Sequence, residues 1–516
     1  MSYFLISYFA LFLPIVIIIY QLVPQKFRWI VLLAADYVFF YMLSGNLIIF
    51  LIAATLFAWG LGLWIGKVGQ NNELAAKDKK KKKAHIMILG ILVSLGVLLL
   101  LKYFNFFGEN IGALANALGS DFVFTPIKFM VPIGISYYTL QIISYLVDVK
   151  RGNQEPVKNL AKIALYLSFF PQIMEGPISR YHQVGEDLYA GRPITFENLK
   201  FGYQRICYGL VKKLIVADRI APLVTKVFGD YQTYDGSVLL LGVLSYTLQL
   251  YAEFSGCMDI IIGSGEILGI KLPENFRQPF FAKDASDFWH RWHITLGTWF
   301  KDYIFFPVSL AKPVKKLAKN IKNHIGKTAS KFTAPFIALF CVWSCNGLWH
   351  GPKWTYIFYG MYYFVIIFVE NLLEEPTKKI TAKLHINREG KGYRVFRFVK
   401  LFIIINLGEM FFRADTVKDG FIMLKGIVTN FHISELFANI WMLKLERADF
   451  FAVLGGLLII IIVGIAKESG KNIRADIAGW KLPLRWIFWY GAIFLVIIFG
   501  AYGAGYTTVD MIYAGY

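Results

Sequence analysis

The chain has 516 residues, of which 57% are hydrophobic and only 17% are charged. Soluble globular chains carry about 45–50% apolar and about 25% charged residues, so this composition excludes an ordinary soluble protein and indicates one large helical membrane domain. The formal net charge is +20, but the cations fall in runs between apolar segments. That pattern is typical of cytoplasmic loops and argues against nucleic-acid binding.

The apolar segments predict an all-α, polytopic membrane protein with about eleven transmembrane helices, because about 20 apolar residues cross the hydrocarbon core. The first segment lacks a basic region and a cleavage site, so we expect a span and not a cleaved signal peptide. Residues 335–373 hold Gly351 and Pro352 near their middle and should break into two helices. The other regular spans are expected at 3–23, 29–43, 47–65, 86–103, 129–149, 401–412, 451–466 and 486–503.

Basic segments between the spans predict which loops face the cytoplasm. Placing all of them inside requires an even number of crossings between neighbours, and the expected spans satisfy this. Residues 104–126 are poor in Lys and Arg, as an outer loop should be. Both termini are therefore expected on the extracytoplasmic side. The basic segments are 24–28, 66–85, 150–162, 311–333, 376–400 and 467–485.

The pattern is less regular between residues 160 and 278. Residues 201–228 mix apolar positions with charges such as Lys212 and Lys213, which predicts an amphipathic helix at the inner interface. Helices at 237–251 and 257–270 should be separated by a break at 253–256. Irregular backbone at membrane depth is tolerated only when it is buried in protein or lines a cavity, so half-length helices indicate a cavity.

The acidic residues beside this break need partners. Glu253, Asp259 and Glu266 lie in or beside apolar runs, and we expect them to satisfy the broken backbone or to pair with Arg277. No internal repeat is found, which argues against transporters built from duplicated halves.

His350 lies at the expected helix break within the sequence Leu348-Trp349-His350-Gly351. An ionisable residue close to membrane depth is a functional-site hypothesis by default. A structural hydrogen bond or an interfacial side chain is the alternative interpretation.

His293 lies among aromatic and charged residues whose spacing fits a helix with aromatics on two faces. The alternative is a surface amphipathic helix at the membrane interface. A histidine deep in a tunnel is suited to general-base work, because its unperturbed pKa is about 6.5. Such a base would take a proton from a hydroxyl that attacks a thioester.

Other classes of site are disfavoured. His290 and His293 lack further ligands for a metal, and the four cysteines, Cys207, Cys257, Cys341 and Cys345, form no C-x-x-C pair. The chain has no G-x-S-x-G elbow, no P-loop and no G-x-G-x-x-G fingerprint. Direct transfer between two bound substrates is left as the natural enzymatic interpretation.

Several blocks, taken in their order and spacing, resemble the membrane-bound O-acyltransferase superfamily, in particular its alginate O-acetyltransferase branch, which is related to the D-alanyl transfer proteins of teichoic acid synthesis. Departures from the family pattern are His290, Lys353 and Glu175. The blocks that carry the resemblance are 132–148, 169–178, 254–259, 272–276, 288–293, 298–303, 347–355 and 411–414.

The resemblance implies a ring of tilted helices around a central tunnel. The whole chain, 1–516, would be one acyltransferase domain with amino-terminal helices at 1–126, a core at 127–373 and carboxyl-terminal helices at 374–516. His350 would be catalytic and His293 a second active-site residue. Residues expected to bind substrate or line the tunnel are Trp289, Trp292, Asn346, Trp349, Ser255 and Glu175.

The implied function is O-acylation of an extracytoplasmic polysaccharide or other cell-envelope polymer, from the inner (plasma) membrane. Acetyl-CoA would be the donor, without a tightly bound cofactor or metal. Membrane lipid surrounds the chain, and an SGNH-type extracytoplasmic partner would deliver the acyl group to the polymer. The alternatives are a transporter or flippase for a lipid-linked sugar, a scaffold for the extracytoplasmic transferase, and D-alanyl transfer to teichoic acid.

Overall fold

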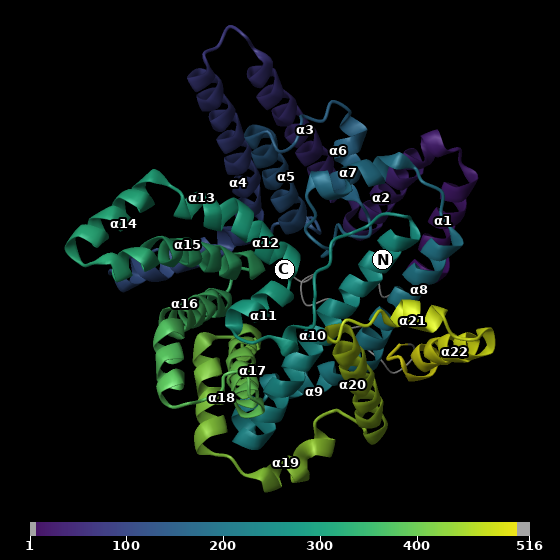
Figure 1. Ribbon diagram of the computed structural model, residues 1–516, viewed down its shortest axis with the longest axis vertical. Coiled ribbons are helices and arrows are strands. Elements are labelled where there is room, and N and C mark those ends of the chain that lie inside the picture. The colour runs from purple at the N-terminus through teal and green to yellow at the C-terminus, as the bar shows by residue number, and fades with distance from the viewer. Residues whose placement is uncertain (1–6, 503–516) are drawn as a thin grey trace. The chain divides into compact units, whose positions relative to one another are not determined.

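The computed structural model describes residues 7–502, which fold mainly into helices (Figure 1). Within this range no strand forms, and the one isolated antiparallel bridge joins Phe276 to Trp292. The predicted all-α class is therefore confirmed. The described residues divide into two compact units, the first built from residues 7–206 and 260–273 and the second from 207–259 and 274–502.

The first unit contains a long helical pair. Helix α3 (Ile48–Gln70) and helix α4 (Ala76–Ala117) lie side by side and pack against α5 (Ile135–Arg151) (Figure 1). Gly90 of α4 faces Leu61 and Leu146 so closely that an added Cβ would lie 2.4 Å from Leu146. Small residues of this kind let helices approach in membrane proteins. The remaining helices of the unit are α1 (Leu13–Leu22), α2 (Arg28–Ser44), α6 (Leu160–Ser168), α7 (Tyr181–Ala190) and most of α8 (Phe196–Leu210).

Two loop predictions in this unit are wrong. The lysine run at 77–83 lies inside the first turns of α4, because Lys and Ala are good helix formers. The same helix continues to Ala117, through much of the expected outer loop at 104–126. The next helix begins at Ile135, after Gly134 with φ +76°, and not at residue 129.

The turn between α6 and α7 is fixed by a buried carboxylate. Asp36 of α2 accepts a hydrogen bond from the backbone N–H of Phe170 at 2.7 Å, and its other oxygen lies 3.3 Å from the hydroxyl of Ser168. These contacts satisfy polar groups that would be costly to bury alone. Glu175 is buried in the same turn, which holds it in the first unit.

The second unit begins at a π-helical turn, Val211–Ala217, followed by α9 (Asp218–Gly229) and α10 (Gly236–Ile267), whose end belongs to the first unit. Helix α10 is continuous through residues 253–256, so the predicted break is wrong. Ion pairs explain this, because Lys213 Nζ lies 3.1 Å from Glu253 and Lys212 Nζ lies 2.5 Å from Asp259. Both lysines are buried, so this turn is not the predicted interfacial surface helix.

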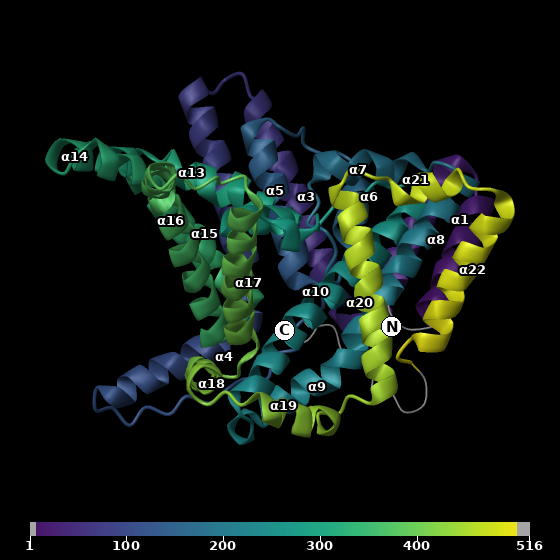
Figure 2. The ribbon, with the colours of Figure 1, turned by 60° about the horizontal axis from the view of Figure 1, so that its bottom comes forward.

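Helices later in the second unit follow the expected spans more closely. Helix α15 (Lys327–His350) and helix α16 (Trp354–Lys383) are separated at Gly351, which has φ +151°, as predicted. Helix α15 packs against α16, and α16 packs against α17 (Lys391–Arg413) (Figure 2). The other helices are α11 (Ala285–Arg291), α12 (Ile294–Phe300), α13 (Phe306–Ser309), α14 (Lys312–His324), α18 (Val417–Thr429), α19 (Ile433–Asn439), α20 (Arg447–Glu468), α21 (Ile473–Ala478) and α22 (Leu482–Phe499).

Seven helical stretches among residues 7–502 are long and apolar enough to cross a membrane, which confirms the polytopic class but not the count of eleven. One of them, Gln25–Gln70, is divided at Gly45 with φ +53°, the turn predicted between the second and third spans. Residues 1–6 and 503–516 lie outside the described range, so the sidedness of the termini stays a prediction. The other stretches are Ala76–Ala117, Gly236–Ile267, Lys327–His350, Trp354–Lys383, Arg447–Glu468 and Leu482–Phe499.

Candidate active site

His350 is the last residue of α15, and its side chain is buried, with 5% of the residue exposed. The helix ends here because Gly351 adopts a φ of +151°, a conformation that side chains rarely tolerate, and Pro352 follows. The imidazole lies edge-on to the rings of Phe412 and Tyr359, with ring centroids 5.1 and 6.0 Å apart. The predicted placement of His350 at a helix break is confirmed.

His293 does not lie within a helix, contrary to the prediction. It separates α11 from α12, with φ +47°, and only 3% of the residue is exposed. The cause is non-local: the bridge between Phe276 and Trp292 pulls the chain into a short extended pairing, in which Arg277 N donates to Arg291 O at 2.9 Å. A surface amphipathic helix is therefore excluded for His293.

Asn275 determines which ring nitrogen of His293 carries the proton. Its Oδ1 accepts from the backbone N–H of Thr295 at 3.0 Å, which identifies that atom as the oxygen of the amide. The same oxygen lies 3.2 Å from Nδ1 of His293. Because an amide oxygen can only accept, Nδ1 must be the donor, and the lone pair of neutral His293 is then on Nε2.

The Nε2 atom of His293 is buried and has no hydrogen-bond partner within residues 7–502. Burial and the neighbouring His350 lower the pKa of His293, whose loop lies outside the seven apolar stretches. His293 therefore stays neutral at physiological pH and presents an unfilled acceptor. Buried polar atoms are nearly always paired, so such an atom marks a candidate binding position.

Trp349 connects the two histidines. Its ring centroid lies 5.5 Å from that of His293 and 5.2 Å from that of His350. On the other side of His293, Phe254 of α10 meets the imidazole edge-on at 4.8 Å. The site is thus an aromatic enclosure with two imidazoles, and it contains little charge.

Three further residues of the second unit were predicted to line the site: Asn346, Trp292 and Trp289. Asn346 is one turn before His350 and buried, and its Oδ1 has no partner among the described residues. Trp292 precedes His293 in the chain and stacks on Phe288, with ring centroids 5.5 Å apart. Trp289 packs against Tyr363 of α16, with ring centroids 4.8 Å apart.

Ser255 is engaged elsewhere, because its carbonyl and hydroxyl oxygens lie 2.9 and 3.0 Å from Nζ of Lys212. Glu175 belongs to the first unit, so its predicted role at the site stays a prediction.

Two residues were missed by the sequence analysis as site residues. Asn275 was recognised only as part of a block, and its contact with His293 depends on the non-local bridge. Glu409 is 1% exposed on α17 and accepts a hydrogen bond from the hydroxyl of Tyr359 at 3.0 Å. A lone carboxylate in the apolar run 401–412 was a usable signal for Glu409.

Within the described range, no group of three or more His, Cys, Asp or Glu side chains is arranged to hold a metal ion. The four cysteines are free thiols.

The sequence profile of the membrane-bound O-acyltransferase family matches residues 154–411, which include both histidines. The chain belongs to the membrane-bound O-acyltransferase family. It is a membrane O-acyltransferase, which confirms the predicted enzyme class.

Relatives span most of the chain. A probable alginate O-acetylase AlgI of Azotobacter vinelandii is 32% identical over 79% of this chain and 74% of its own length. A peptidoglycan O-acetyltransferase of Helicobacter pylori is 28% identical, over 74% of this chain and 73% of its length. A teichoic acid D-alanyltransferase of Bacillus subtilis is 31% identical over 48% of this chain and 60% of its length.

Proposed function

We propose that this enzyme moves an acetyl group from acetyl-CoA on the cytoplasmic side across the membrane, for O-acetylation of an extracytoplasmic cell-envelope polysaccharide. Two relatives that are named for O-acetyl transfer match about three quarters of the chain, whereas the D-alanyltransferase of Bacillus subtilis matches about half. Acetyl transfer is therefore favoured over D-alanyl transfer. The observation that carries the proposal is the pair of buried histidines on either side of Trp349.

His350 acts as the general base or proton relay. Its imidazole takes the proton of the attacking hydroxyl while the hydroxyl oxygen forms a bond to the thioester carbonyl carbon. The carbon–sulfur bond then breaks, and the proton passes to the departing thiolate of coenzyme A. A positioned general base of this kind contributes roughly 10²–10⁴-fold to a rate.

His293 positions the nucleophile. Its Nε2 lone pair, fixed by Asn275, is suited to accept a hydrogen bond from a hydroxyl, and this sets the direction of attack. Asn346, Trp289, Trp292 and Trp349 would orient the substrates and exclude water. Ser255 and Glu175 are further candidates for the lining of the tunnel.

The acetyl group would leave on the extracytoplasmic side, where both termini are proposed to lie. The described residues form membrane-type helices with short connections, so we propose that an SGNH-type partner delivers the group to the polymer. No tightly bound cofactor or metal is needed for this reaction. The regions 1–126, 127–373 and 374–516 would together form one membrane-embedded domain.

The test combines a deletion strain with purified protein in lipid nanodiscs. Envelope polymer from the deletion strain should lack a 42-dalton acetyl increment. That increment should return with the wild-type chain and not with His350→Ala. The matched control is His324→Ala, which changes an exposed histidine on α14. Acetylation that survives His350→Ala in a folded protein would contradict the assignment of His350.

A further inference from the structure

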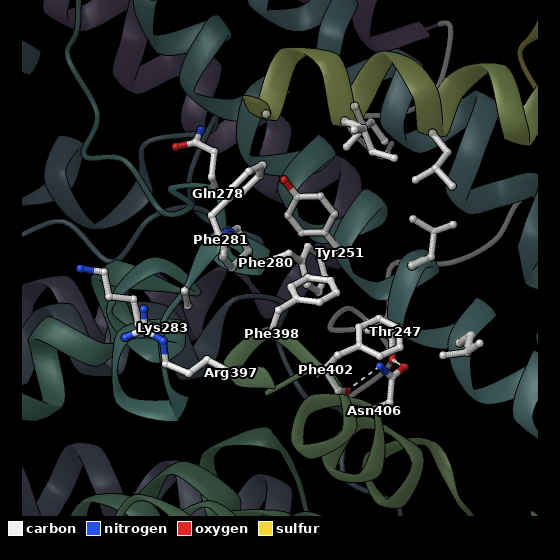
Figure 3. Close-up of a pocket in the computed structure, with 18 of the residues that line it drawn as sticks. Thr247, Tyr251, Gln278, Phe280, Phe281, Lys283, Arg397, Phe398, Phe402 and Asn406 are labelled. Atoms are coloured by element: carbon white, nitrogen blue, oxygen red, sulfur yellow. Dashed lines mark hydrogen bonds between the residues drawn. The ribbon is translucent and has the colours of Figure 1, made fainter. Parts of the chain in front are cut away.

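A cavity whose lining includes neither His293 nor His350 lies within the second unit (Figure 3). Its volume is about 920 Å³, and its walls come from α10, α17, α20 and the segment 278–283. Helix α10 faces it with Leu244 and Leu248, and helix α20 with Leu457 and Ile461, each pair one helical turn apart. The cavity is therefore a groove that runs along helices and has apolar walls.

The groove is about as long as one membrane leaflet is deep. On α17 its lining extends from Arg394 to Asn406, twelve residues or about 18 Å at 1.5 Å per residue. One leaflet of the hydrocarbon core is about 15 Å deep, half of about 30 Å. Phe398 and Ile461, which line the groove, are 51% and 45% exposed, so an apolar molecule can enter from the side.

Cations gather at one end of the groove. Figure 3 places Lys283 and Arg397 together there, away from Thr247 and Asn406. Among residues 7–502, neither of these two cations has an ion-pair partner, whereas Arg394 lies 3.6 Å from Glu389. Arg397 packs over the ring of Tyr393, 5.5 Å from its centroid, and this contact leaves its charge uncompensated. Cations without an acidic partner at the mouth of an apolar groove are complementary to an anionic head group.

The other end of the groove offers little to a polar ligand. The hydroxyl of Thr247 donates to Asn406 Oδ1 at 2.8 Å, and Asn406 Nδ2 donates to the carbonyl of Phe402 at 2.8 Å. These groups satisfy each other and leave the deep end suited to a hydrocarbon tail.

We propose that this groove is a binding site for an anionic glycerophospholipid of the cytoplasmic leaflet. Its phosphate would lie between Lys283 and Arg397, and one acyl chain would lie along α10, α17 and α20. The basic segment 376–400, which contains Arg397, is expected on the cytoplasmic side, where anionic lipids attract cations. An acetyl-CoA molecule would bring no long apolar chain to fill a groove of this depth.

The bound lipid would brace the active-site loop. Tyr251 and Phe280 both line the groove. The ring centroid of Tyr251 lies 6.0 Å from that of Trp292, and the ring centroid of Phe280 lies 6.3 Å from that of Phe288. The groove segment 278–283 begins three residues after Asn275, which holds His293. Lipid occupancy is thereby connected to the position of His293 through packed side chains.

The test is native mass spectrometry of the full chain, purified from an equal mixture of phosphatidylglycerol and phosphatidylcholine. The wild type should retain phosphatidylglycerol preferentially. Lys283→Ala combined with Arg397→Ala should reduce that retention about 10–30-fold, since each cation near an anionic lipid contributes about 1 kcal/mol. The matched control is Lys319→Ala with Lys322→Ala, two cations on α14 that do not line the groove.

Gly464→Leu provides a second variant that changes no charge. Gly464 lines the groove, and a Cβ added there would lie in ordinary contact, 3.5 Å from Phe281, so the larger side chain would fill the space. It should displace phosphatidylglycerol while the protein stays monodisperse. Equal retention of both lipids, unchanged retention in both variants, or displacement of phosphatidylglycerol by acetyl-CoA would overturn the proposal. Retention is measured without turnover, so it is independent of the proposed acetyl transfer.

Discussion

The second unit contains two buried polar regions that differ in how their polar groups are paired. In the first, a charged cluster, Lys212 and Lys213 from the π-turn lie 2.5 to 3.1 Å from Asp259, Asp218 and Glu253. In the second, the histidine site, there is no such compensation: Nε2 of His293 and Oδ1 of Asn346 have no hydrogen-bond partner within residues 7–502.

The difference distinguishes polar groups that stabilise the fold from polar groups that are available to a substrate. Paired charges hold helices together and already satisfy each other, so they do not bind a substrate. Removing one partner leaves an uncompensated buried charge. An unfilled acceptor in an aromatic enclosure is costly for the fold and is retained where a ligand fills it. The two regions are neighbours, since Ser255 accepts from Lys212 and the adjacent Phe254 packs on His293.

The largest expected effect is on stability, from breaking the charged cluster. Lys213→Met leaves Glu253 and Asp218 buried without their shared cation and should destabilise the protein by about 3–5 kcal/mol. The measurement is thermal unfolding in detergent, followed by intrinsic fluorescence. Lys226→Met is the control, because Lys226 is part of an exposed ion pair, which contributes little to stability.

His293→Ala should lower turnover by more than its loss of stability explains, so turnover is expressed per folded molecule. Loss of the Nε2 acceptor misplaces the nucleophile, and misplacement of this kind costs about 10²-fold in rate. Release of coenzyme A from acetyl-CoA in nanodiscs measures the effect. His290→Ala is the neighbouring control, because His290 is exposed and bonds only to the carbonyl of Ser286 among the described residues. Equal losses in both variants would show that His293 has no special role.

Asn275 tests whether the tautomer of His293 matters. Asn275→Leu removes the acceptor for Nδ1 and should lower turnover about 10-fold, in keeping with about 1–3 kcal/mol for a buried group left unpaired. Asn275→Asp keeps an acceptor at the same place and should restore most of the turnover. Its carboxylate favours the charged imidazole, so the acid limb of the pH–rate profile should move to higher pH. An unshifted profile would argue for a purely structural role.

The smallest effect is expected when both partners of a pair are replaced together. Lys212→Met combined with Asp259→Leu removes two buried charges at once and leaves none uncompensated at that pair. Replacement of a buried ion pair by apolar residues is often neutral, so stability should change by no more than about 1 kcal/mol. A large loss of stability on thermal unfolding would show that the hydrogen bonds to Ser255 matter more than the charges.

The sequence predicted those parts of the fold that depend on local signals. Gly351 and Pro352 end α15 at His350 because each acts on its own backbone, and the apolar runs of α15, α16 and α20 are continuous. The break in α10 and the helix through His293 were predicted wrongly, because each depends on a distant partner. The partners of Glu253 and Asp259 lie 40 or more residues earlier, and the bridge at Trp292 pairs with Phe276.

In the candidate site, too, the features that depend on local signals could be predicted and those that depend on distant partners could not. His293 and His350 could be selected from the sequence because ionisable residues beside long apolar runs are rare. The proton position on His293 could not, because it depends on Asn275 and Thr295 meeting at one oxygen.

The most direct test of the central claim compares two variants in the same nanodiscs. Turnover of acetyl-CoA per folded molecule is measured for His293→Ala and for Lys212→Met with Asp259→Leu. If unfilled polar atoms carry the chemistry and paired charges carry the fold, the first variant loses about 10²-fold and the second stays within a few-fold of the wild type. The reverse result, full turnover without His293 and loss of turnover without the ion pair in a folded protein, would contradict the account.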